Sequence, residues 1–193
     1  PSAIIGGKLP FIGGNSVVGK SDIIVCEACE YVNTFLQMHP AISVILNVDA
    51  DHLDFFKNLD NIKKSFNQFA KQTSQLLVIN GDDKNSVECT ADVNLKKLFY
   101  GFDSKNDYYA ANYQKGEGVS QSFDLMSDGK LITKITLNVP GKHNVLNALA
   151  AITVALYLGA EPENIAKSIA EFSGVHRRFE VLGNVNGITV ADD

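Results

Sequence analysis

The sequence predicts an α/β fold, in which helices flank a mostly parallel sheet and an antiparallel β ribbon is added to it. Short apolar runs without alternation occupy residues 23–28, 42–48 and 76–80, which is typical of strands buried on both faces. An amphipathic helix is predicted over 58–72, between the second and third runs, so strand, helix and strand form a right-handed βαβ unit. Residues 107–138 alternate more and predict the antiparallel ribbon.

The elements of the parallel part follow from local patterns. Apolar side chains at Leu59, Ile62, Phe66 and Phe69 recur at helical spacing and give the helix one apolar face. The run Asn80–Asp83 has turn composition and ends the strand before it. Residues 97–102, just ahead of the ribbon, alternate more than the apolar runs, as the ribbon itself does.

In the second half of the chain, turn residues and helix-ending residues also mark the bounds of the predicted elements. Within the ribbon, Ser127–Lys130 predicts a hairpin turn. A long apolar helix over 144–158 is stopped by Gly159. Pro162 suits a first helical turn, so a second helix is expected from there through Phe172, with Gly174 closing it. The last stretch, 179–191, alternates around Asn186–Gly187 as a hairpin does.

Composition narrows the function classes. Seventeen basic against 22 acidic side chains give a net charge of −5, which argues against nucleic acid as the main partner, because phosphate binding leaves a basic footprint. No apolar stretch approaches the roughly 18 residues that span a bilayer, so no membrane partner is expected. Cys26, Cys29 and Cys89 are interpreted as reduced thiols of a cytoplasmic protein. Cys26 and Cys29 point to opposite faces of a strand, which disfavours a zinc or redox pair.

Residues 14–21, Gly-Asn-Ser-Val-Val-Gly-Lys-Ser, match the phosphate-loop pattern GxxxxGK[ST] letter for letter. Such a loop binds phosphate because a helix follows it and turns free N–H groups and its dipole toward the anion. Here a strand pattern follows Ser21 instead. We therefore interpret the match as a glycine-rich loop that leads into a strand. The alternative, a stand-alone P-loop nucleotidase that uses Lys20, predicts a helix after Ser21.

Glu27 and His52 are the candidate metal ligands. Glu27 lies at the end of one predicted parallel strand and His52 follows the end of the next, and ligands of open α/β sheets collect beyond the carboxyl ends of the strands. A carboxylate and an imidazole that meet there can bind a divalent cation, although Mg²⁺ prefers oxygen. The alternative is an Asp-rich surface turn that only ends a strand.

Two further constellations suggest a nucleotide. Asn144 and Asn147 share one face of a helix start, and a carboxamide offers the donor and the acceptor that an adenine edge needs. A simple helix cap is the alternative. Arg177 and Arg178 lie outside any helix and can present a guanidinium fork to phosphate, unless they are only a solvated charge pair.

Taken together, these pieces resemble the Mur ligase family, and within it the branch that adds L-alanine. No single motif is specific, but the set occurs in the family's order and spans nearly the whole chain. The segments that carry the resemblance are Ala3–Gly7, Glu27–Glu30 with Phe35-Leu36, Asn47–Asp54, Pro140–Asn147, Arg177–Glu180 and Asp192-Asp193.

The resemblance implies a three-domain ligase with a P-loop-NTPase-like middle domain. It assigns residues 1–191 to that ATP-binding domain and residues 192–193 to the start of the amino-acid-binding domain. It also implies that the family's P-loop strand and helix lie upstream of Pro1, so the chain is expected not to catalyse alone. An uncovered sheet edge or apolar face would then favour self-association.

Residue roles are carried over from the resemblance. Glu27 and His52 would ligate magnesium beside the ATP phosphates, and Arg178 would contact the terminal phosphates. Asn144 and Asn147 would hold adenine. Asp193 would approach the ribose of the nucleotide. Gly6, Gly7 and Asn15 would belong to the loop that holds the UDP-linked substrate.

The chemistry implied is carboxylate activation, in which ATP phosphorylates the lactyl carboxylate of UDP-N-acetylmuramate and the amine of L-alanine displaces phosphate, in peptidoglycan precursor synthesis. Many relatives read Glu-Ala-Asp-Glu-Ser-Asp where this chain has residues 27–32, and no lysine here matches the carbamylated lysine of some members. The alternatives are a sister ligase of the muropeptide-recycling or folylpolyglutamate type, or a non-catalytic nucleotide-binding module.

Overall fold

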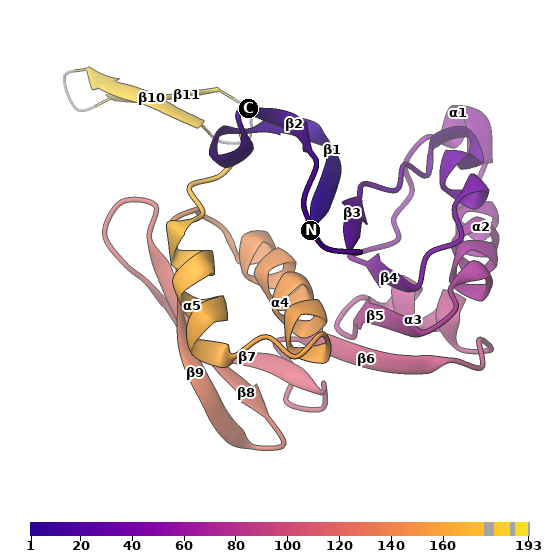
Figure 1. The fold of residues 1–193 in the computed structure, drawn as a ribbon. Coiled ribbons are helices and arrows are strands. Elements are labelled where there is room, and N and C mark those ends of the chain that lie inside the picture. The colour runs from indigo at the N-terminus through magenta and orange to yellow at the C-terminus, as the bar shows by residue number, and fades with distance from the viewer. Residues whose placement is uncertain (176–179, 186–187, 193) are drawn as a thin grey trace.

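The computed structural model describes residues 1–175, 180–185 and 188–192, in which a six-stranded mixed sheet carries most of the core (Figure 1). Its strand order is β4-β5-β6-β7-β8-β9, and a separate three-stranded sheet has the order β2-β1-β3. The strands are β1 (Ser2–Leu9), β2 (Gly14–Val17), β3 (Ile24–Cys26), β4 (Ile42–Ile45), β5 (Leu76–Asn80), β6 (Lys96–Gly101), β7 (Tyr108–Lys115), β8 (Gln121–Ser127), β9 (Lys130–Leu137), β10 (Glu180–Val185) and β11 (Ile188–Asp192). The helices are η1 (Pro10–Ile12), η2 (Tyr31–Gln37), α1 (Leu53–Phe56), α2 (Leu59–Gln72), α3 (Lys84–Thr90), α4 (Lys142–Tyr157) and α5 (Pro162–Glu171).

Strand β5 lies between two hydrophobic cores, as its unbroken apolar run predicts. All five of its residues are buried. Leu76 and Val78 pack into the core that holds α4 and α5, while Leu77 and Ile79 pack into the core beneath α2 and α3. Alternate side chains of a strand point to opposite faces, so the first four residues of β5 are all apolar, and the buried Asn80 at its end donates its side-chain amide to the carbonyl of Leu46. Helices therefore cover both faces of the parallel part, and the predicted α/β class is confirmed.

The three predicted helices form as α2, α4 and α5, with bounds within two residues of those predicted, whereas η1, η2, α1 and α3 were not predicted. The side chain of Asn58 accepts a hydrogen bond from the Asn61 amide and caps α2, and Pro162 occupies the first turn of α5. Helix α4 ends before Gly159, whose φ of +85° is left-handed. Glycine adopts that conformation without the steric cost of a side chain, which explains why the long helix stops there.

The ribbon predicted over residues 107–138 is formed by β7, β8 and β9, which pair antiparallel. It is joined to the parallel strands directly, because β7 pairs parallel to β6 through Tyr100 and Tyr108. The predicted turn at Ser127–Lys130 connects β8 to β9, with Asp128 and Gly129 at positive φ. Helices α4 and α5 lie over the ribbon (Figure 1).

The prediction that residues 23–28 and 42–48 are buried on both faces is wrong for the shorter strands that form there. Strand β3 pairs with β1 in the small sheet, and Ile24 and Val25 are 58% and 53% exposed. In β4 only one face is buried, since Ile45 is 2% exposed and Val44 39%. An apolar run shows what a strand is able to bury, but the covering element decides what it does bury. Within the described residues, β3 and β4 each lie at the edge of a sheet.

The segment with the phosphate-loop pattern does not form a phosphate loop. Gly14–Val17 is a strand that pairs antiparallel with β1, and the residues after Ser21 continue into β3 without a helix. The hypothesis of a stand-alone P-loop nucleotidase is thereby contradicted, because the helix dipole and free amides on which such a site depends are missing there.

Two smaller observations complete the fold. Strands β10 and β11 form the predicted C-terminal hairpin, whose Asn186–Gly187 turn lies outside the described residues. Among the described helices, none has the length and apolar character required to traverse a bilayer.

Candidate metal and nucleotide site

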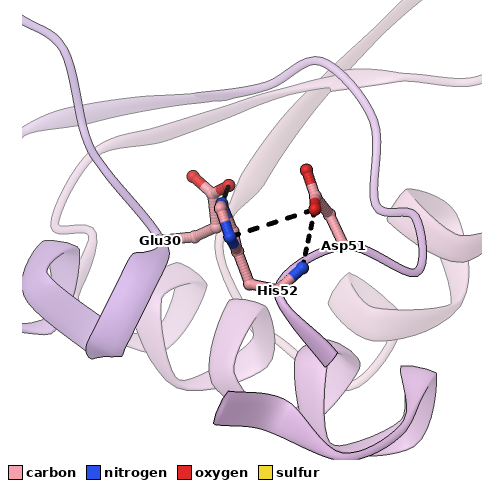
Figure 2. A group of neighbouring side chains, drawn as sticks. All are labelled: Glu30, Asp51 and His52. Carbon is pink, nitrogen blue, oxygen red and sulfur yellow. Dashed lines mark hydrogen bonds and ion pairs between the residues drawn. The ribbon is translucent and has the colours of Figure 1, made fainter. Parts of the chain in front are cut away.

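Glu30, Asp51 and His52 gather beyond the carboxyl end of β4, and their side chains point toward one another (Figure 2). The Nε2 atom of His52 lies 3.5 Å from Oε1 of Glu30, and its Nδ1 atom lies 3.9 Å from Oδ1 of Asp51. One ligand atom from each residue falls within 4.8 Å of the others. Two carboxylate oxygens and one imidazole nitrogen form a donor set that a divalent cation accepts.

The backbone conformation at His52 is stabilised by the neighbouring Asp51 side chain. The Asp51 carboxylate accepts a hydrogen bond from the His52 amide at 2.7 Å, and His52 itself is left-handed, with φ 51° and ψ 41°. Histidine is among the residues that enter this region more readily than most. The ring of Tyr31 lies 4.7 Å from the imidazole, centroid to centroid, so one face of His52 is covered by an aromatic side chain.

The turn after β5 holds the segment that leads to His52. The Asn80 side chain donates to the carbonyl of Leu46 at 3.0 Å. The Asp83 carboxylate accepts from the Val48 amide at 3.1 Å, and the Asn85 side chain donates to the Val48 carbonyl at 2.8 Å. The sequence indicated only a turn at Asn80–Asp83. The structure shows that the same residues fix the chain beyond β4, where the cluster forms.

Glu27, the predicted partner of His52, makes a different contact. Its Oε2 atom accepts a hydrogen bond from the Gly6 amide at 2.5 Å. A Cβ atom at position 6 would lie 2.7 Å from that oxygen, so glycine is required for the close approach. The structure thus joins two predicted site residues, Glu27 and Gly6, and it brings His52 together with Glu30 and Asp51. The metal pair Glu27–His52 stays a prediction.

Sequence reasoning did not single out Glu30 and Asp51. Both lie in segments that attracted attention, one three residues after Glu27 and one directly before His52. The turn between Glu30 and the rest of η2 is irregular, with Val32 and Asn33 both at positive φ. No strand or helix periodicity predicts where a side chain points in such a turn, so the sequence offered no means of choosing Glu30.

A hollow of about 280 Å³ opens beside the cluster. Glu30 and Asp51 line one part of it, and apolar side chains of β4, α1 and α2 line the rest, among them Ile45, Phe56 and Ile62. A charged rim above an apolar wall is the usual composition of a small-molecule site.

Asn144 and Asn147 lie at the start of α4, as predicted. The Asn144 side chain donates to the carbonyl of Pro140 at 2.7 Å, and its Oδ1 atom accepts from Asn147 at 3.3 Å. The cap that was the competing explanation is not the role of Asn144, since the N-cap of α4 is Gly141. Gly141 has φ +93°, a conformation that favours glycine. The two carboxamides thus form one connected pair on the first two turns of the helix, with Asn144 half-buried and Asn147 exposed.

The other predicted site residues are placed as follows. Gly7 lies beside Val175, because a Cβ atom there would fall 2.6 Å from the valine side chain, and Asn15 is exposed on β2. Arg177, Arg178 and Asp193 lie outside the described residues. Cys26, Cys29 and Cys89 are free thiols, in keeping with the expectation of reduced cysteines.

The family is decided by comparison with known proteins. The model of the Mur ligase middle domain matches residues 12–155. This chain belongs to the Mur ligase family. The resemblance inferred from the ordered motifs is therefore confirmed, and so is the expected middle-domain fold.

Named relatives within the Mur ligases agree with this placement. The chain is 46% identical, over its whole length, to the UDP-N-acetylmuramate–L-alanine ligase of Caldanaerobacter subterraneus subsp. tengcongensis, and 44% identical to that of Clostridium acetobutylicum. It spans 42% of the length of each of these curated relatives.

Solved Mur ligases share the fold. The UDP-N-acetylmuramate–alanine ligase of Thermotoga maritima superposes with a TM-score of 0.84 at 28% identity, over 100% of this chain and 44% of that one. The UDP-N-acetylmuramate:L-alanyl-γ-D-glutamyl-meso-diaminopimelate ligase of Neisseria meningitides superposes with a TM-score of 0.81 at 24% identity, over 92% of this chain and 59% of that one. At that identity the second match supports the fold alone.

Proposed function

We propose that this chain is the middle part of a cytoplasmic, ATP-dependent ligase that joins L-alanine to the lactyl carboxylate of UDP-N-acetylmuramate, a step of peptidoglycan precursor synthesis. The observation that carries the proposal is the identity of 42–46% along the entire chain to ligases that bear that name. The proposed domain assignment, with residues 1–191 in the ATP-binding domain and 192–193 at the start of the next, rests on the same resemblance.

The proposal includes a magnesium site at His52, with Glu27 as its predicted partner. The residues present fit the ion, because His52, Glu30 and Asp51 converge to within 4.8 Å and supply mainly oxygen donors. His52 and Glu30 are half exposed, which leaves room for the water ligands that magnesium retains. A bound magnesium ion would neutralise charge on the ATP phosphates. The chain's own part is to hold the donors beyond β4 through Asn80 and Asp83.

The nucleotide is proposed to bind at the start of α4. The linked carboxamides of Asn144 and Asn147 offer donors and acceptors to an adenine edge. Arg178 is proposed to contact the terminal phosphates and Asp193 the ribose. On the substrate side, Gly6, Gly7 and Asn15 are proposed to cradle the UDP-linked sugar, and Glu27 supports this loop through its hydrogen bond to Gly6.

The reaction proceeds by two displacements. A lactyl carboxylate oxygen attacks the γ-phosphorus of ATP, the bond to the bridging oxygen breaks, and ADP leaves. The amine of L-alanine then attacks the acyl carbon of the acyl-phosphate, phosphate leaves with the bonding electrons, and the amine loses a proton. Both steps gather negative charge on phosphate oxygens, so their rates depend on orientation and on cations held in place.

The test is phosphate release from ATP by the full-length protein that contains this chain, with Mg²⁺, UDP-N-acetylmuramate and a panel of amino acids. Release that depends on L-alanine, and that falls at least about a hundredfold in His52→Ala and Arg178→Ala, is the expected result. Glu163→Gln, on the exposed first turn of α5, is the matched control and should retain activity.

Other outcomes are equally informative. Release with a peptide or another amine, but not with L-alanine, would assign the chain to a sister ligase. A folded protein without substrate-dependent release would contradict the proposal and favour a binding module.

A further inference from the structure

Gln121 is a fully buried polar side chain on the inner face of the ribbon. It is 2% exposed and shares the buried face of β8 with Phe123 and Leu125, which are fully buried. A polar group in such a position costs free energy unless its hydrogen-bonding capacity is used. An amide at this position therefore requires partners that an apolar residue would not have.

All three hydrogen-bonding functions of the Gln121 amide are used. Its Nε2 atom donates to the carbonyl of Val139 at 2.6 Å and to the carbonyl of Gly141 at 3.0 Å. Its Oε1 atom accepts from the hydroxyl of Tyr113 at 2.9 Å. A carboxamide has two N–H donors on one nitrogen and one carbonyl acceptor, so this set matches its chemistry completely.

The two carbonyls that Gln121 holds bracket Pro140. The carbonyl of Pro140 accepts from Asn144 at 2.7 Å, so side-chain amides bind three consecutive carbonyls of the turn before α4. Gly141 allows this course of the chain, because its φ is +93°. A Cβ atom there would lie 2.5 Å from the ring of His143. The turn is thus fixed by hydrogen bonds from the ribbon on one side and from α4 on the other.

Tyr113 links this arrangement to the first residue of α4. While its hydroxyl donates to Gln121, its ring lies 5.7 Å from the Lys142 ammonium, and the ring of Phe102 lies at the same distance from that ammonium. Cation–π contacts of this kind are modest individually, but here they act on the residue that starts the helix. The ribbon therefore contacts both the turn and the helix start from which Asn144 and Asn147 project.

We propose that Gln121, supported by Tyr113, is a positioning residue for the nucleotide: it fixes the Val139–Gly141 turn and so sets the orientation of the Asn144–Asn147 pair. The inference rests on the proposed function, in which that pair binds adenine. Gln121 acts only through the turn and does not itself contact the nucleotide.

The experiment compares Gln121→Met with wild type in the full-length protein. Methionine keeps the length of the side chain and removes all three hydrogen bonds. The KM for ATP is expected to rise about tenfold, because two carbonyls of the turn lose their donors, while kcat changes less than threefold. Tyr113→Phe, which removes one hydroxyl and keeps the ring, should raise the ATP KM by about two- to fivefold and covers the case in which Gln121→Met does not fold.

Thr73→Val is the matched control. It also removes a buried hydrogen bond, the 2.6 Å contact between Thr73 and Ser43, but that contact lies beside β4 and outside the turn. It should lower the melting temperature without changing the ATP KM. A second measurement, amide hydrogen exchange over residues 139–147 of the full-length protein, should show faster exchange in Gln121→Met and Tyr113→Phe and wild-type exchange in Thr73→Val.

The outcomes separate the two proposals. Normal turnover with an unchanged ATP KM and unchanged exchange in Gln121→Met and Tyr113→Phe would overturn this inference and leave the proposed function intact. An equal rise of the ATP KM in Thr73→Val would overturn it as well, because the effect would then be one of stability. A wild-type protein without ATP turnover would overturn the proposed function, and this inference would fail with it.

Discussion

Gly6 illustrates how one residue shapes the site at the smallest scale. The Glu27 carboxylate lies on the Gly6 amide, in space that any side chain would fill. Since the clash would be with the end of a flexible side chain, the carboxylate can move away at small cost to folding. The contact therefore bears on where Glu27 points more than on the stability of the chain.

We accordingly expect Gly6→Ala to affect activity more than stability. The displaced Glu27 carboxylate should lower kcat/KM of the full-length protein about tenfold or more, because small misplacements at a reacting centre are costly, with a change in unfolding free energy below about 1 kcal/mol. Gly183→Ala is the control, since nothing lies within 4 Å of a Cβ atom there and Gly183 lies on β10, outside the substrate loop. Equal activities of the two variants would contradict the assignment.

Cys89 is a residue whose effect is on stability and not on the site. Burial raises the pKa of its thiol to about 11, from the value of about 9 that an exposed thiol has. Between these values the unfolded chain loses the proton and the folded chain keeps it, so the folded state becomes less stable as pH rises. Burial raises the pKa of Tyr100 in the same direction.

The expected result is a loss of unfolding free energy between about pH 9 and pH 11, of at most about 1.4 kcal/mol per pH unit from Cys89. Urea unfolding of wild type and Cys89→Ala at pH 8, 9.5 and 10.5 measures it. Below pH 8.5 the two pH dependences should coincide, and above it the wild type should lose stability faster. Parallel curves throughout would show that the thiol does not contribute.

At the scale of elements, α3 couples a helix start to the segment that carries His52. The Asp83 carboxylate caps the helix by accepting from the Ser86 amide at 2.8 Å, and the same oxygen accepts from the Val48 amide. One side chain therefore stabilises α3 and holds the chain beyond β4. Loss of the Asp83 cap should therefore loosen the chain segment that leads to His52, whereas loss of a cap on another helix should not.

Replacement of the two helix caps tests this coupling. Asp83→Ala should lower the unfolding free energy by about 1 to 2 kcal/mol and accelerate exchange of the Val48 amide. Asn58→Ala, which removes the cap of α2, should lower stability by a similar amount and leave the Val48 amide protected. NMR-detected exchange and urea unfolding provide both readouts. Protection of Val48 in both variants would show that the Asp83 contact is not needed there.

At the scale of the whole molecule, the two sheets leave apolar strands uncovered within the described residues. Strands β3 and β4 lie at sheet edges, and Ile24, Val25 and Leu46 are 58%, 53% and 42% exposed. An exposed apolar edge is a template for pairing with another chain. The 193-residue chain, taken alone, should therefore associate with itself at high concentration.

Sedimentation velocity over a range of concentrations measures that association. Ile24→Lys should shift the chain toward monomer, because a charged side chain on an edge strand opposes pairing. Leu158→Lys is the control, since Leu158 is similarly exposed, at 49%, but lies at the end of α4 and outside any strand. A monomeric wild-type chain, or an equal effect of both substitutions, would contradict the assignment of the interface to β3.

The sequence determined most of the larger elements and their order, because the interactions that form them are local, but it did not predict β1, β2, α1 or α3. The spacing of Leu59, Ile62, Phe66 and Phe69 fixes α2 and its buried face, and the turn at Ser127–Lys130 fixes the β8–β9 hairpin. The ordered motifs likewise indicated the family. The burial of β3 and β4 could not be predicted in this way, since composition does not show which faces of a strand other elements will cover.

Only the tertiary structure decided which side chains meet. Glu30 and Asp51 lie against His52, while Glu27 binds Gly6 across 21 positions of the sequence. Gln121 finds its two carbonyl partners 18 and 20 residues away. Such contacts depend on strand register and on left-handed turns such as Val32-Asn33, where a change of one residue redirects a side chain. Local periodicity contains no information on the direction in which such a side chain points. The sequence pattern therefore determined the scaffold, and tertiary packing determined the contacts within the site.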